Sequence, residues 1–136
     1  MKFITKAIDL SSGDFTLQLD RACRCYIGLV EWHMPCLDKK GDNVIDITCD
    51  QIDSDFENPK RLLKRVFPGD ENWKKMTHYM PNFIDFKLID SQDRFLNFKV
   101  RLSSGNSSVK FDKSTIAHIV LAIRPINEKD DMWLRI

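Results

Sequence analysis

The chain contains 136 residues, of which 43% are hydrophobic and 30% charged, and this balance excludes a disordered, collagenous or membrane-spanning protein. Its length fits one compact domain, residues 1–136, with a short N-terminal arm at residues 1–10 and a C-terminal tail at residues 126–136. The 21 basic and 20 acidic side chains give a net charge of +1, which lacks the positive excess typical of proteins that bind nucleic acid or anionic lipid.

The beginning of the chain, Met1–Lys6, lacks the apolar run and cleavage site of a secretory signal. No stretch has the roughly 18 consecutive apolar residues that a membrane helix needs. We therefore expect an intracellular, non-secreted protein without a membrane partner. The four cysteines have no regular spacing, and we expect them to be reduced and to act as small buried hydrophobic residues: Cys23, Cys25, Cys36 and Cys49.

Alternation of apolar and polar residues indicates β-strands along most of the chain. The first clear strand is predicted over Phe15–Leu19 and has the pattern of an outer strand. Cys25–Trp32 is apolar on both faces apart from Glu31, which predicts a central strand. Val44–Cys49 is the next predicted strand.

The segment 58–67 departs from this alternation. Asn58 suits a helix cap, Pro59 suits a first helical turn, and Pro68 with Gly69 suits a helix stop. The apolar residues between these signals recur at helical spacing: Leu62, Leu63 and Val66. The local pattern therefore predicts one short helix.

Alternation returns over Phe83–Ile89 and Leu96–Leu102, and the polar stretch Asp90–Arg94 between them predicts an antiparallel hairpin. The last strand, Ile116–Ile123, is rich in β-branched residues, which predicts a position in a sheet that is covered on both faces. Pro125 ends it. The whole pattern predicts an all-β fold, an antiparallel β-sandwich of single jelly-roll type with one short helix.

No set of residues predicts a catalytic, cofactor or metal site. The three histidines, His33, His78 and His118, fall on separate predicted elements and lack the His-x-His spacing of a cupin-type metal site. Cys23 and Cys25 lack the second ligand pair that a tetrahedral zinc site requires. We therefore expect a protein that is not an enzyme and that uses no cofactor.

A basic cluster after the third predicted strand is a weak candidate anion patch: Lys60, Arg61, Lys64 and Arg65. Acidic residues directly before it cancel much of its field: Asp50, Asp53, Asp55 and Glu57. These acidic residues lack the central glycine and closing glutamate of a calcium-binding EF-hand loop. The expected role of both clusters is a solvated surface.

Three groups of segments between residues 14 and 124 carry a family resemblance. They are Phe15–Leu19 with Cys25–Trp32; Ile47–Ile52 with Leu62–Val66; and His78–Pro81 with Phe86–Phe98 and Val120–Arg124. In this order they resemble the small single jelly-roll capsid proteins, of penton or minor capsid type, that Polinton (Maverick) elements and related adenovirus-like double-stranded DNA viruses encode. The family pattern has a strand over Leu62–Phe67, where the local signals predict a helix.

The resemblance implies a structural protein that forms a homo-oligomer, with a pentamer as the favoured ring, and that contacts other capsid proteins in a virion if the protein is viral. A ring of identical copies covers the sheet edges that a sandwich leaves exposed. The candidate interface residues are large apolar groups at the two ends of the chain, and the tail packs either on its own subunit or on a neighbour: Phe3, Ile4, Met132, Trp133, Leu134 and Ile136.

Two other function classes stay open. The chain could be a cytokine-like or lectin-like module that binds a peptide or carbohydrate through its end loops, although the missing signal peptide argues against this class. It could also be a small nucleic-acid-binding β protein, and the near-zero net charge argues against this reading. In that case the basic cluster would act together with Trp73, Lys74, Lys75 and Tyr79.

Overall fold

The computed structural model describes residues 1–19, 24–35, 44–52, 61–66, 76–79, 83–90, 94–104, 107–109 and 116–126. These residues form strands and turns, and none of them is helical. The strands are β1 (Lys2–Asp9), β2 (Asp14–Gln18), β3 (Arg24–Pro35), β4 (Val44–Cys49), β5 (Leu62–Val66), β6 (Met76–Tyr79), β7 (Lys87–Asp90), β8 (Phe95–Ser104), β9 (Ser107–Val109) and β10 (Ile116–Pro125).

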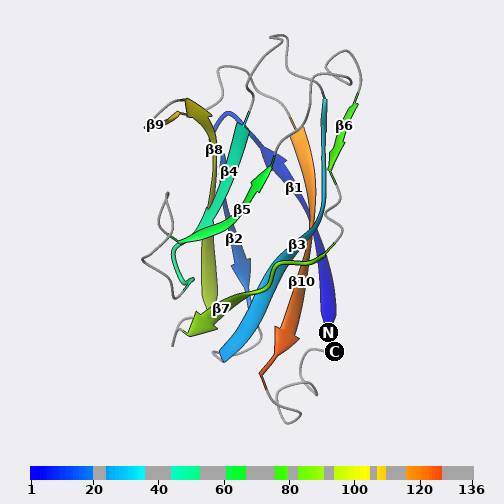
Figure 1. Ribbon diagram of the computed structural model, residues 1–136, viewed down its shortest axis with the longest axis vertical. Helices are drawn as coiled ribbons and strands as arrows, with labels where there is room; N and C mark the ends of the chain where they lie inside the picture. Colours follow the sequence, from blue (N-terminus) through cyan, green and yellow to red (C-terminus); the bar gives the residue numbers. More distant parts are fainter. Residues whose placement is uncertain are drawn as a thin grey trace.

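Two antiparallel sheets of five strands each pack face to face (Figure 1). Sheet A has the order β1-β10-β3-β6, and β7 pairs with the beginning of β3, whereas β6 pairs with its end. Sheet B has the order β2-β8-β4-β5, and β9 pairs with β8. The first strand thus lies beside the last, and β2 lies beside β8 in the other sheet, which is the strand order of a jelly roll. The predicted all-β, jelly-roll sandwich is confirmed.

The alternation of apolar residues placed several strands correctly. β2 is an outer strand of sheet B, as predicted, and its burial alternates along Asp14–Gln18. β3 is central because it pairs with β10 on one side and with β6 and β7 on the other. β10 lies between β1 and β3, and three consecutive residues in it, Leu121–Ile123, are buried, so this part of sheet A is covered on both faces.

The core lies between the two sheets. Phe15 of β2 and Phe98 of β8 are register partners, and their rings stack with centroids 4.7 Å apart. Trp32 is the largest of the fully buried side chains. Cys25 and Cys49 are buried in the same cluster and form no disulfide, which confirms the expected role of these two cysteines. Cys23 and Cys36 lie outside the described residues.

The predicted helix over residues 58–67 is wrong: Leu62–Val66 form strand β5, and residues 58–60 and 67 lie outside the described residues. The register against β4 shifts between Ile47 and Thr48, which leaves Leu63 as an extra residue in β5. This bulge lets Leu63 and Val66 both face the core although they are three positions apart. A bulged strand therefore reproduces the apolar spacing of a helix.

The predicted hairpin between 83–89 and 96–102 is also wrong. β7 pairs with β3 in sheet A, whereas β8 pairs with β2 and β4 in sheet B, so the chain changes sheets between them. The strand β7 begins only at Lys87. The preceding residues, Phe83–Phe86, are not part of a strand.

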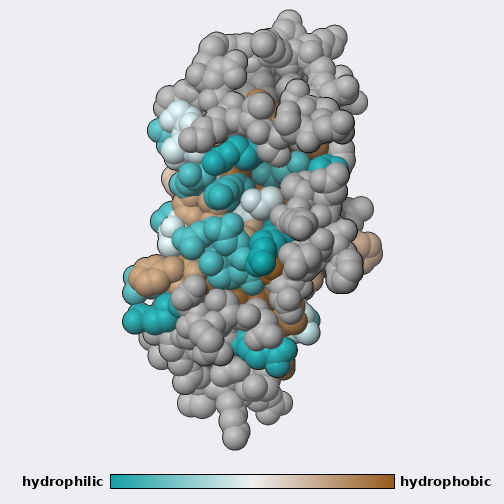
Figure 2. All heavy atoms as spheres, turned by 90° about the vertical axis from the view of Figure 1, so that its left-hand side faces the viewer, coloured by the Kyte–Doolittle hydropathy of each residue, from teal (hydrophilic) through white to brown (hydrophobic). Residues whose placement is uncertain are grey.

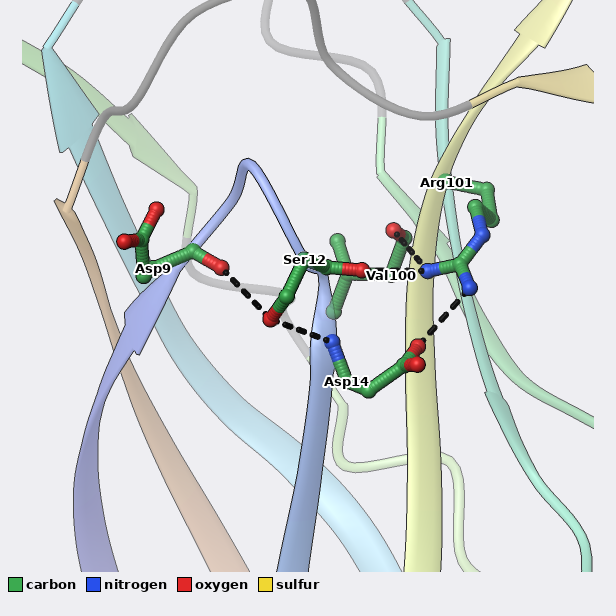
Figure 3. A network of polar contacts seen from close by, with 5 residues as sticks. All are labelled: Asp9, Ser12, Asp14, Val100 and Arg101. Carbon is green, nitrogen blue, oxygen red and sulfur yellow. Dashed lines mark hydrogen bonds and ion pairs between the residues drawn. The ribbon is translucent and has the colours of Figure 1, made fainter.

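A tight corner joins β1 in sheet A to β2 in sheet B (Figure 3). Arg101 of β8 donates to the Asp14 carboxylate at 2.8 Å and to the backbone oxygen of Ser12 at 3.3 Å. Gly13 has a φ of +69°, and a Cβ there would lie 2.4 Å from the Val100 carbonyl oxygen, so the corner requires glycine. Residues 2–9, which were predicted as part of an arm, thus form an edge strand. This strand pairs with β10 over its whole length, and the corner holds its end.

Candidate functional site

The outer faces of the two sheets differ in chemistry. Hydrophilic side chains dominate the middle of the side on which β8, β9 and β5 lie (Figure 2). Along β2 and β8 the exposed positions are mostly polar or charged: Asp14, Thr16, Gln18, Asn97 and Lys99. Phe95, 50% exposed, is the large hydrophobic exception on these two strands. Sheet B therefore presents a solvated face.

One part of the outward face of sheet A is apolar. Its outward positions include Phe3 in β1, Val120 and Ala122 in β10, and Tyr26 in β3. Ile84 and Phe86, which precede β7, lie over the same surface because they contact the position of Gly28. We call this set the apolar face of sheet A: Phe3, Tyr26, Ile84, Phe86, Val120 and Ala122.

The segment Ile84–Phe86 crosses sheet A where two small residues are register partners, Gly28 and Ala122. A Cβ at Gly28 would lie 2.4 Å from Cγ2 of Ile84 and 3.3 Å from the Asp85 carbonyl oxygen. The missing side chain therefore makes room for this covering segment. The segment begins at Phe83, whose side chain is 84% exposed.

Arg124, at the end of β10, joins the covering segment to sheet A. Its guanidinium carbon lies 4.7 Å from the Phe86 ring centroid and 5.0 Å from that of Tyr26. Both distances are within the range of cation–π attraction. The apolar face is thus built from three strands and one loop segment rather than from a single strand.

Only part of the predicted interface falls on described residues. Phe3 lies on β1 with 57% of its surface exposed, and its register partner in β10 is Ala122. Ile4 is partly buried and packs against the core of its own subunit. The tail residues of the prediction lie outside the described residues: Met132, Trp133, Leu134 and Ile136.

The candidate anion patch is largely engaged in contacts within the chain. Arg61 has a φ of 60° and donates to the backbone oxygens of Asp50 and Ile52, so it fixes the connection that follows β4. Arg65 pairs with the buried Asp46 carboxylate at 2.7 Å. Lys64 is half-buried on β5, and Lys60 lies outside the described residues. The two arginines thus serve structural contacts, which weakens the patch as an anion site.

The register of sheet A brings the histidines together, which the sequence did not indicate. His118 of β10 pairs with His33 of β3, and His33 pairs with His78 of β6. We call these three positions the histidine row. Glu31, two residues before His33 in β3, has its Oε2 atom 3.2 Å from Nε2 of His33. Register between distant strands is not visible in a single sequence, so no local signal could have found this row.

No protein-family model and no curated protein matches the chain. Similar solved structures include the Drosophila NLP core, a structure that bears on pentamer formation and histone binding, at a TM-score of 0.43 and 11% identity over 91% of this chain and 97% of that one. The nora virus structure has a TM-score of 0.31 and 5% identity, over 90% of this chain and 54% of that one.

A third similar structure is the virus-like particle of extra small virus from the giant freshwater prawn Macrobrachium rosenbergii. Its TM-score is 0.25 at 12% identity, over 93% of this chain and 79% of that one. At these identities the likeness concerns the sandwich fold alone.

Among the described residues no helix is long and apolar enough to cross a membrane.

Proposed function

We propose that the chain is a structural subunit that associates with copies of itself into a closed ring, with five copies favoured, as a penton or minor capsid-type protein. The observation that carries the proposal is the edge strand β1. Among the described strands β1 pairs with β10 and with no other. It exposes Phe3, which belongs to the apolar face of sheet A. A long edge strand with an exposed aromatic residue is a surface on which another chain can dock.

The two lysines of β1 do not protect its exposed face. Lys2 and Lys6 alternate with the outward residues and are half-buried, on the face that carries Ile4 and Ile8. The outward positions of β1 are Phe3, Thr5, Ala7 and Asp9, and only Asp9, the last residue of the strand, is charged. Natural edge strands commonly carry lysine or another charge that blocks pairing with a second chain. Over residues 3–7 the outward face of β1 lacks that protection and favours contact with a partner.

A closed ring needs two different surfaces that fit each other. β1 with Phe3 supplies one of them, and the covering segment with the exposed Phe83 supplies the second in our proposal. The tail residues from Met132 to Ile136 add apolar groups to the contact. Such a subunit carries out assembly and no chemical reaction, acts inside the cell, and contacts other capsid proteins within a virion if the protein is viral.

The proposal is tested by measuring the molar mass of variants with multi-angle light scattering after size-exclusion chromatography. Phe3→Asp places a charge in the proposed contact and is expected to shift the mass from a ring toward the monomer. Phe95→Asp makes the same change at a residue of similar exposure on sheet B and is expected to leave the ring intact. An equal effect of the two variants, or none from Phe3→Asp, would overturn the proposed interface.

A further inference from the structure

The histidine row is the strongest feature of the fold that self-association does not explain. His118, His33 and His78 occupy consecutive register positions on β10, β3 and β6. Direct partners in antiparallel strands have Cβ atoms about 4.5–5.5 Å apart, close enough for two imidazole rings to share one ion. His118 is exposed, and the side chains of His33 and Glu31 are 34% and 32% exposed, so an ion can reach them from solvent.

The contact between Glu31 and His33 already has the spacing of two metal ligands. Oε2 of Glu31 lies 3.2 Å from Nε2 of His33. In a tetrahedral zinc site with bonds of about 2.0–2.1 Å, two ligand atoms are roughly 3.3 Å apart. A zinc ion can therefore take the place of the hydrogen that these two atoms now share. Carboxylate oxygen and imidazole nitrogen are both ordinary zinc ligands.

A third ligand must come from a neighbouring strand. Among the side chains that the structure describes, no three histidine, cysteine, aspartate or glutamate groups converge as they stand. His118 is exposed and is the register partner of His33, so a change of rotamer can bring its ring toward the ion at small cost. His78 holds the register position on the other side of His33.

We propose that sheet A binds a divalent transition-metal ion, zinc by preference, through Glu31, His33 and His118. Two kinds of ligand, imidazole and carboxylate, suit zinc better than calcium or magnesium, which favour oxygen ligands alone. The site joins β10 and β3, and ligands on both strands would tie that part of the sheet together. It does not depend on self-association.

Isothermal titration of the metal-free, full-length chain with Zn²⁺ tests the proposal. We expect one ion per chain. His118→Asn and His33→Asn should each weaken zinc binding by at least about tenfold, because even the loss of an outer partner of a metal site has an effect of that size. Thr5→Ala, on the same face of the neighbouring strand β1, is the matched control and should leave the affinity unchanged. Because His118 is exposed, its variant remains informative if His33→Asn fails to fold.

A second readout identifies the ligands. The Cε1–H signals of the histidines are followed by NMR during the titration, and those of His33 and His118 should shift together and saturate at one equivalent. An affinity that neither histidine variant changes would place the ion elsewhere in the chain and overturn the proposal. Absence of zinc binding to the wild-type chain would overturn it as well.

Discussion

Arg65 of β5 holds Asp46 of β4 through two hydrogen bonds on the outer face of sheet B. Nε donates to Oδ1 at 2.7 Å and Nη2 donates to Oδ2 at 3.2 Å. The Asp46 side chain is only 2% exposed, whereas that of Arg65 is 36% exposed. The hydrogen bond to Asp46 raises the pKa of Arg65 above its ordinary value. The pair is thus a buried carboxylate covered by a partly solvated cation.

This asymmetry predicts unequal effects of breaking the pair from its two sides. Arg65→Met leaves a buried carboxylate without its partner and should lower the free energy of unfolding by about 3 kcal/mol. Asp46→Asn leaves a guanidinium that can turn to water, and the loss should be about 1 kcal/mol or less. Urea unfolding of the two variants measures both values. A larger loss for Asp46→Asn than for Arg65→Met would contradict the assignment of Asp46 as the buried partner.

Gly28 is predicted to be intolerant of a side chain, because the covering segment occupies the space. Gly28→Ala brings a Cβ into contact with Ile84 and with the Asp85 carbonyl and should cost about 1–3 kcal/mol of stability. Ile84→Ala in the same chain should restore part of that loss, because it removes the methyl group that lies nearest to the new Cβ. A double-mutant cycle by thermal or urea unfolding measures the coupling. Additive effects of the two changes would show that the segment does not pack on Gly28.

Cys49 makes stability depend on pH in the alkaline range. Burial raises the pKa of its thiol from 9.0 to about 12. Above pH 9 the unfolded chain therefore releases a proton that the folded chain keeps, and stability falls as the pH rises toward 12. Each pH unit in this window costs about 1.4 kcal/mol.

The matched comparison is wild type against Cys49→Ala, each unfolded in urea at pH 8 and at pH 10. Other groups titrate equally in both proteins, so the decline between the two pH values should be smaller in the variant by about 1.4 kcal/mol. Identical declines would mean that the thiol ionises in the folded protein as it does in the unfolded one.

The fold class was predictable because burial follows alternation in most strands. Phe15–Leu19 and Val44–Cys49 needed no information beyond their own sequence. Alternation failed where a bulge intervened: the extra residue Leu63 in β5 gave an apolar spacing that a helix also has. Local patterns also do not identify the partner of a strand. The change of sheet between β7 and β8 therefore appeared as a hairpin.

The candidate sites were predictable only in part. Phe3 stood out as an apolar residue near the beginning of the chain, and it is exposed on an edge strand. The apolar face and the histidine row both depend on register between segments that are tens of residues apart, such as His33 and His118. Arg61 and Arg65 suggested an anion patch because the sequence does not show that backbone carbonyls and Asp46 engage them.

The tail supplies a further test of assembly. Deletion of residues 127–136 removes four of the six predicted interface residues and should shift the ring toward smaller species at equal protein concentration. Thermal unfolding of the shortened chain distinguishes packing on the neighbour from packing on the same subunit, since only the latter lowers the stability of the monomer. Unchanged assembly would remove the tail from the interface.

Self-association itself is the central claim, and sedimentation velocity of the full-length wild-type chain over a wide range of concentrations tests it most directly. We predict a single closed species of fixed copy number, with five copies favoured, that persists on dilution and is lost in Phe3→Asp. A chain that sediments as a monomer at every concentration would contradict the claim.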